Sequence, residues 1–290
     1  MGGCVFIGVR KRSLQQHVGN GKTGNPCGFR GGLRKVKLHV LGCAGGIGGR
    51  QRHTTCLQLD DDILLDAGTG ITSLDLVQLA GINHVFLTHS HLDHVAGLAL
   101  LVDTVLGKRA EPVTVHASEQ VIDALKEHLF NWALWPDFAA IPSVGNPVLR
   151  WAPFKPGETI DIKGRIIATY PVNHTAGSVA YFAHQGNRGF LFTGDMCSTP
   201  SLWAAVAREN HLSKVIVDCS FPNSEHELAA RSKHFCPQAL LADVGAMPDS
   251  IEFLIYHLKP GQEDLIMAQL NAAGSRRVFK ALACSDVFVF

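Results

Sequence analysis

The sequence predicts an α/β fold in which residues 38–290 form one domain. Segments with the two-residue repeat of strands alternate with segments that have the helical repeat along this whole stretch, and no linker separates them. Hydrophobic residues make up 46% of the chain, which is enough for a sizeable core. No stretch approaches the roughly 20 apolar residues that a membrane span needs. We therefore expect a globular protein with no membrane contact.

The first 37 residues carry neither repeat. They contain eight basic residues and no acidic one, and the basic residues follow the short apolar stretch 4–9 instead of preceding it. This order is not that of a signal peptide. We interpret residues 1–37 as a disordered extension or as the product of a start codon assigned too far upstream, and we expect a cytoplasmic protein.

The net charge of +1 is the sum over two unlike parts of the chain. Residues 38–290 hold 18 Lys and Arg against 25 Asp and Glu, and 18 − 25 gives −7. A nucleic-acid-binding domain usually presents a basic surface, so we expect no DNA partner. The eight cysteines are widely spaced without a Cys-x-x-Cys pair, which predicts reduced thiols and no structural metal cluster.

The first half of the domain begins with an alternating strand pattern at 36–41. The glycine-rich segment 42–49 precedes another strand instead of a helix, and it lacks the Gly-Lys-Ser/Thr of a phosphate-binding loop. We expect a tight loop whose backbone approaches another segment closely. Further along this half, the pattern predicts strands at 54–59, 63–66, 84–88 and 113–116, and helices at 73–80, 96–106 and 119–130.

Strands dominate the pattern from residue 148 onward, and helices return near the end. Strands are predicted at 160–162, 165–172, 178–184, 189–192, 214–219 and 250–257. Helices are predicted at 201–209, 237–244 and 263–272. The interleaving supports one α/β domain instead of two separate ones.

The strongest chemical signal is the segment 88–97, which reads Thr-His-Ser-His-Leu-Asp-His-Val-Ala-Gly directly after an apolar strand. Strand alternation points His89 and His91 the same way, and entry into a helix presents Asp93 and His94 from another angle. Two groups of ligands that face one pocket suit a pair of metal ions. Imidazole and carboxylate donors without a thiolate favour zinc, manganese or iron.

This motif resembles the signature of the metallo-β-lactamase superfamily, which implies a four-layer αββα sandwich with a metal site at the edge of its two sheets. Three residues at later strand ends match the other ligands of the family. The resemblance implies that His89, His91 and His174 hold one metal, that Asp93, His94 and His257 hold the second, and that Asp195 bridges them. Asp66, also at a strand end, matches an aspartate that positions ligands from behind.

Within the superfamily, the chain resembles the class II 3′,5′-cyclic nucleotide phosphodiesterases. The supporting stretches are Leu-Asp-His-Val-Ala-Gly-Leu at 92–98, Leu-Phe-Asn-Trp at 129–132, Ser-Phe-Pro-Asn at 220–223 and His-Leu-Lys-Pro at 257–260. The resemblance implies that a metal-bridging hydroxide opens cAMP or cGMP to the 5′-monophosphate. Two divalent metal ions, zinc before manganese or iron, would serve as cofactors, with Asp93 acting in catalysis as a ligand.

His234 is the candidate proton donor, because it resembles a histidine that phosphodiesterases of the superfamily place opposite the metals. The alternative is a surface histidine beside Lys233. Substrate contacts are expected from Trp135, Phe138, Ser220 and Asn223, although the aromatic residues could equally form a lid or pack in the core.

Three other functions stay open at this level. One is a tRNA 3′-processing endonuclease of the same superfamily, which the acidic domain and the missing Gly-Pro-rich arm between Asp103 and His174 disfavour. Another hydrolase of the same fold is the second, and a degenerate metal-binding scaffold without activity is the third. All seven expected ligands are present, which disfavours the scaffold. The sequence is compatible with a homodimer.

Overall fold

The computed structural model describes residues 35–49, 52–272 and 277–290. Strand β1 (Lys37–Gly42) begins one residue before the predicted domain boundary. Residues 1–34 of the predicted extension lie outside the described residues. Within the described ranges, no helix combines the length and the apolar character needed to cross a bilayer.

The first half of the chain supplies most of a seven-stranded mixed sheet. The strand order is β16 (Val287–Val289), β1, β2 (Cys56–Leu59), β3 (Ile63–Leu65), β4 (His84–Phe86), β5 (Val113–Ser118) and β8 (Leu149–Phe154). Neighbouring strands from β16 to β3 run antiparallel, and neighbouring strands from β3 to β8 run parallel.

The second half supplies another seven-stranded sheet with the same division into antiparallel and parallel parts. The order is β15 (Phe279–Ala281), β14 (Glu252–Tyr256), β13 (Leu212–Asp218), β12 (Arg188–Phe192), β11 (Val179–Gln185), β10 (Arg165–Pro171) and β9 (Thr159–Ile162). A small hairpin, β6 (Pro142–Ser143) and β7 (Asn146–Pro147), lies outside both sheets.

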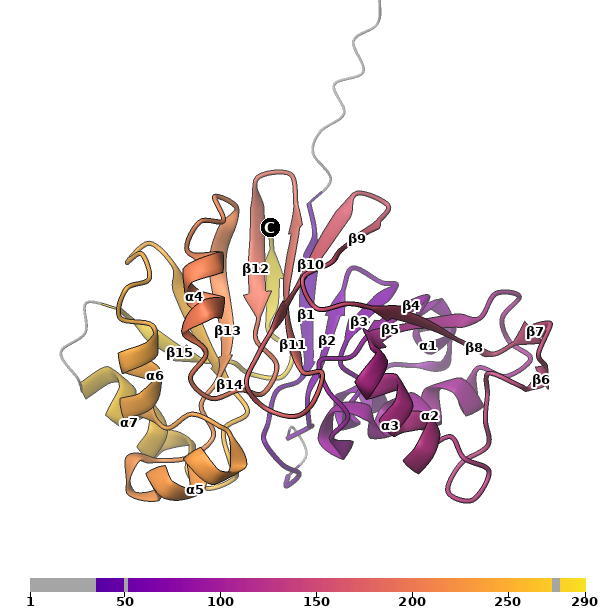
Figure 1. Ribbon diagram of the computed structural model, residues 1–290, viewed down its shortest axis with the longest axis horizontal. Coiled ribbons are helices and arrows are strands. Elements are labelled where there is room, and N and C mark those ends of the chain that lie inside the picture. Colours follow the sequence, from indigo (N-terminus) through magenta and orange to yellow (C-terminus); the bar gives the residue numbers. More distant parts are fainter. Residues whose placement is uncertain (1–34, 50–51, 273–276) are drawn as a thin grey trace, which may run out of the picture. The chain divides into compact units, whose positions relative to one another are not determined.

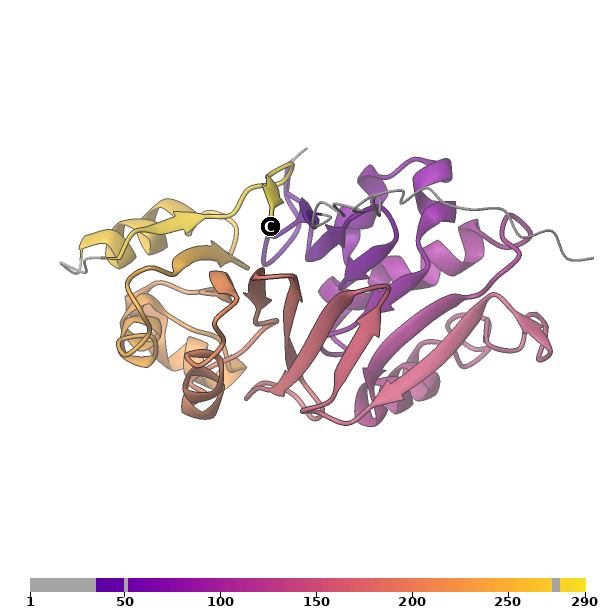
Figure 2. The ribbon, with the colours of Figure 1, turned by 90° about the horizontal axis from the view of Figure 1, so that it is seen from above.

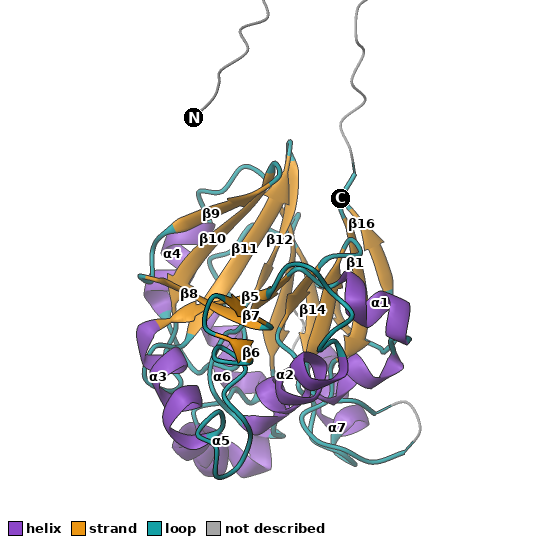
Figure 3. Cartoon of the chain, turned by 90° about the vertical axis from the view of Figure 1, so that its right-hand side faces the viewer, coloured by secondary structure: helices purple, strands orange, loops and turns teal. Residues whose placement is uncertain are grey.

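Helices cover the outer face of each sheet (Figures 1 and 2). The helices on the first sheet are α1 (Leu76–Gly81), α2 (Leu92–Thr104) and α3 (Glu119–His128). Those on the second are α4 (Pro200–Val206), α5 (His226–Ser232), α6 (Pro237–Asp243) and α7 (Glu263–Ala272). Two short 3₁₀ turns, Thr69–Ser73 and Asn223–Glu225, precede α1 and α5. Figure 3 shows the molecule from the side of α1, α2 and α3, with the strands in orange and the helices in purple.

The side-chain alternation of the strands produces three buried layers. In β3, Leu64 packs with the helices, while Ile63 and Leu65 face the second sheet. One cluster lies between the sheets, and the other two lie between a sheet and its helices. The predicted four-layer αββα sandwich is therefore confirmed.

The structure also differs from the predicted elements. Helix α2 begins at Leu92, four residues before the predicted start, because His91 already adopts the extended backbone of an N-cap residue. The prediction missed the short helix α5 and the edge strands β8, β15 and β16. These elements are too short, or too exposed on one side, to show a clear repeat.

Candidate metal centre

The histidine motif lies at the junction between β4 and α2. His89 follows the buried strand, His91 is the N-cap residue of α2, and Asp93 and His94 occupy its first turn. The ring centroids of His89 and His91 are 4.7 Å apart, and those of His89 and His94 are 4.2 Å apart. The turn from strand to helix therefore brings the four side chains of the motif to one place.

Three more side chains reach this place from the second sheet. His174 follows β10, Asp195 follows β12, and His257 follows β14, so each stands just beyond the end of a strand. One oxygen of Asp195, Oδ2, lies at the centre of the group, and the hydroxyl of Tyr256 donates to the other oxygen at 2.8 Å. The Nε2 atoms that surround Oδ2 lie at 3.7 Å (His89), 3.3 Å (His94), 3.9 Å (His174) and 3.3 Å (His257).

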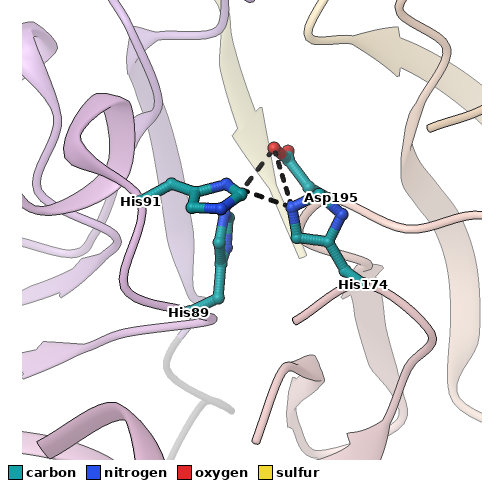
Figure 4. A group of neighbouring side chains, drawn as sticks. All are labelled: His89, His91, His174 and Asp195. Atoms are coloured by element: carbon teal, nitrogen blue, oxygen red, sulfur yellow. Dashed lines mark hydrogen bonds and ion pairs between the residues drawn. The ribbon is translucent and has the colours of Figure 1, made fainter. Parts of the chain in front are cut away.

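The side chains form two groups that share Asp195. One contains His89, His91 and His174, and Figure 4 shows these three rings with Asp195. The other contains Asp93, His94 and His257. The potential ligand atoms within each group all lie within 4.8 Å of one another. The grouping matches the division that the resemblance implied.

The outer nitrogen of several rings is held by a neighbouring group, which directs the inner nitrogen toward the centre. These outer contacts are His94 Nδ1 with Asp66 (2.7 Å), His257 Nδ1 with Ser220 Oγ (2.8 Å), His174 Nδ1 with the Lys233 carbonyl (3.0 Å) and His89 Nδ1 with Thr88 Oγ1 (2.9 Å). Ring orientation of this kind is characteristic of histidines that ligate metals.

Two observations test whether a divalent metal fits this arrangement. The Nε2 atom of His89 is fully buried and has no hydrogen-bond partner among the described residues, an unusual state for a polar atom. Burial also lowers the pKa of His174 to about 4 and that of His89 well below its ordinary value, which leaves both rings neutral near pH 7. Neutral imidazoles with inward lone pairs, beside carboxylates, fit zinc and similar ions. The metal assignment of each residue stays a prediction.

Asp66 lies behind His94, on the side away from Asp195. Its buried carboxylate accepts hydrogen bonds from the Thr88 amide (2.7 Å), the Thr88 hydroxyl (2.8 Å) and His94 Nδ1 (2.7 Å). Asp66 has a positive φ of 57°, which few residues other than glycine adopt. The strand end thus connects both His89, through Thr88, and His94 to one carboxylate.

His234 also reaches the centre instead of lying on the surface. Its Nδ1 is 2.7 Å from Asp218 Oδ2, and its ring stacks on His257 with the centroids 5.0 Å apart. Burial opposes protonation of His234, but the carboxylate of Asp218 outweighs it and raises the pKa of the ring. No sequence motif marks Asp218, although this residue ends an apolar strand.

The glycine-rich segment lies against His257. A Cβ atom on Gly45 would lie 2.3 Å from the carbonyl oxygen of His257, so the predicted close approach of this loop is confirmed. The carbonyl of Cys43 accepts from the amide of His257 at 2.8 Å, and Lys259 Nζ donates to the carbonyl of Gly45 at 2.8 Å. The loop thereby holds the backbone of His257, whose φ is 63°.

Of the four expected substrate contacts, Phe138 is buried in the core and the other three have partners within the protein, so their contacts with substrate stay a prediction. Phe138 is 2% exposed in the core, so it offers no face to a base. Trp135 packs against the same core and donates through Nε1 to the carbonyl of Ala99. Ser220 is buried and contacts the histidine rings from behind. Asn223 accepts from the amide of Gln238 at the start of α6. The aromatic character of Trp135 and Phe138 could not show by itself whether these residues pack in the core or bind substrate.

The sequence of the chain is similar to those of several known proteins. A 3′,5′-cyclic-nucleotide phosphodiesterase from Schizosaccharomyces pombe is 27% identical over 243 residues, which cover 70% of this chain and 68% of the relative. A "Probable 3′,5′-cyclic-nucleotide phosphodiesterase" from Yersinia pestis is 26% identical, with 66% of this chain and 62% of the relative covered. A Ribonuclease Z from Bradyrhizobium is 36% identical over 117 residues, or 39% of this chain and 36% of the relative.

Comparison with a solved structure supports the αββα fold. Unliganded yeast PDE1 superposes with a TM-score of 0.74 over 88% of this chain and 99% of its own, at 18% identity. The sequence profile of the beta-lactamase superfamily domain matches residues 62–278, which include all seven expected ligands. The chain therefore belongs to the metallo-β-lactamase superfamily, and within it the chain resembles the class II cyclic-nucleotide phosphodiesterases.

Proposed function

We propose that this protein hydrolyses 3′,5′-cyclic nucleotides to 5′-monophosphates with the aid of two divalent metal ions, zinc foremost. The observation that carries the proposal is the buried His234–Asp218 pair beside two His and Asp groups that share Asp195. Such a site combines metal ligands with a proton donor, which is what cleavage of a phosphodiester with an alkoxide leaving group requires.

The metal ions would be held by His89, His91 and His174 on one side and by Asp93, His94 and His257 on the other, with Asp195 between them. When bound, such ions lower the pKa of water to about 7 and neutralise the charge that develops on phosphoryl oxygens. The remaining tasks, to orient the substrate and to move a proton, belong to the protein.

In this proposal His234 delivers that proton. Asp218 engages Nδ1 at 2.7 Å, so the proton on the other ring nitrogen, Nε2, is available to the substrate. In the reaction water loses one proton to the solvent and its oxygen bonds to phosphorus, the P–O3′ bond breaks, and His234 protonates the departing O3′. His234 then regains a proton from the solvent. Asp218 fixes the orientation of the ring and stabilises its charged form, as the aspartate of a catalytic triad does for its histidine.

The choice of a cyclic nucleotide rests on the two phosphodiesterase relatives, which match about two thirds of this chain, and on the charge of the domain. Residues 38–290 carry a net charge of −7, which disfavours a polyanionic RNA substrate. A Ribonuclease Z from Pyrobaculum aerophilum matches an equal share of this chain, 66%, at 26% identity. RNA processing is therefore the alternative that the test must separate.

Hydrolysis of cAMP, cGMP, bis(p-nitrophenyl) phosphate and a tRNA precursor, each with and without a chelator, tests the proposal. We expect chelator-sensitive conversion of cAMP to 5′-AMP. Replacing His234 by alanine should lower turnover by roughly 100- to 10,000-fold without loss of bound metal, the usual contribution of a proton donor. His128→Ala, an exposed histidine at the end of α3, is the matched control. Cleavage of the tRNA precursor alone, or full turnover of His234→Ala, would contradict the proposal.

A further inference from the structure

A cavity of about 500 Å³ opens beside His234, between α5, α6 and the segment that follows β12. Figure 1 shows these two helices next to each other beyond the second sheet. Three wall residues connect the cavity to the candidate metal centre. His234 itself lines it, Asn173 directly precedes His174, and Cys197 follows Asp195 by two residues. The cavity therefore adjoins the centre on its His234 side.

The chemistry of the walls is that of a small-molecule site. Four alanines, Ala229, Ala230, Ala239 and Ala242, leave a wide apolar hollow between the helices. Asn173 and Gln238 add two carboxamides, and within the described part of the chain neither side chain is engaged in a hydrogen bond. Ligand pockets of roughly 300–1,000 Å³ typically combine apolar walls with a few polar groups of this kind.

We propose that this cavity binds the purine nucleoside part of the cyclic nucleotide. The inference rests on the proposed function and follows from the position of the leaving group. His234 protonates O3′, and O3′ is bonded to the ribose that also carries the base. The nucleoside must therefore extend from the His234 side of the centre, and this cavity adjoins that side. Carboxamides such as those of Asn173 and Gln238 can pair with the edge of a purine.

The experiment compares cAMP with ribose 3′,5′-cyclic phosphate, which has the same ring phosphate but no base. The quantity measured is the ratio of their kcat/KM values. The wild type should favour cAMP by about tenfold or more, since even small changes in pocket contacts produce effects of this order. Ala230→Phe, on the cavity wall, should fill the space and reduce this ratio toward one. Ala204→Phe, at an alanine on α4 that is also exposed but does not line the cavity, should leave the ratio unchanged.

The outcomes separate this inference from the proposed function. If the wild type hydrolyses neither compound, the proposed function fails. If it hydrolyses both equally well, or if Ala230→Phe keeps the wild-type ratio, the function stands and the cavity inference is wrong. Gln238→Leu, which removes the carboxamide and keeps the bulk of the side chain, provides a second test if Ala230→Phe does not fold. It should raise the KM for cAMP, and an unchanged KM would contradict the proposed pairing.

Discussion

Replacing Asp66 by asparagine should weaken the binding of one of the two metal ions. The Oδ1 atom of Asp66 accepts from the Thr88 amide at 2.7 Å, and an amide N–H can only donate. The oxygen of the new side chain must therefore take this place. Its NH₂ group then replaces Oδ2, which lies 2.7 Å from His94 Nδ1. His94 must accept at Nδ1 and so carries its proton on Nε2, the atom that faces Asp195.

A ring with a proton on Nε2 cannot offer that nitrogen to a metal. Substitution of groups that orient metal ligands typically costs roughly 10- to 100-fold in metal affinity, or about 1.4–2.7 kcal/mol. The effect should fall on the metal held by Asp93, His94 and His257. The site formed by His89, His91 and His174 should also bind its metal less tightly, because Thr88 contacts both Asp66 and His89. We expect the loss there to be smaller, since the Nδ1 partner of His89 is retained.

Competition with a chromophoric chelator, together with metal analysis of the purified protein, measures both affinities. Asp62→Asn is the matched control: the same substitution at the other end of β3, remote from the ligands. It should leave both affinities unchanged. An Asp66→Asn protein that retains two metals with wild-type affinity would refute the tautomer argument.

Two further predictions concern the ion pair of Asp62 with Arg165 and the loop that lies against His257. Burial opposes ionisation of Asp62, but the hydrogen bonds and charge of Arg165 lower its pKa below the ordinary value. The stabilisation is therefore complete above about pH 4 and disappears as the pH falls through the folded-state pKa, so between pH 5 and 3 the Tm of the wild type should fall more than that of Asp62→Asn. Parallel slopes in thermal melts would contradict this. Gly45→Ala should displace His257 and lower the metal content, because the added Cβ would lie 2.3 Å from its carbonyl oxygen. Gly145→Ala, with open space around it, is the control, and equal metal content in both variants would contradict the prediction.

The parts of the site that are local in sequence could be predicted from the sequence. His89, His91, Asp93 and His94 fall within six residues after a strand, so their convergence follows from the geometry of one strand–helix junction. His174, Asp195 and His257 on the second sheet could be predicted as ligands only from the resemblance to the superfamily, because no local sequence pattern shows that distant strand ends meet.

Other features depend on tertiary packing and left no clear signal. Phe138 is as aromatic as a base-stacking residue, but only the packed structure shows that its ring is buried in the core. Asp218 looks like any strand-end aspartate until it is seen beside His234. The cavity is formed by α5 and α6, and α5 is too short to show a helical repeat.

The most direct test of the central claim is a metal titration of the chelator-treated protein, with the conversion of cAMP to 5′-AMP as the readout. The two ligand groups predict that activity is absent without metal and rises with zinc until about two equivalents per chain are bound. Full activity of the metal-free protein, or no cAMP turnover after two equivalents have bound, would contradict it.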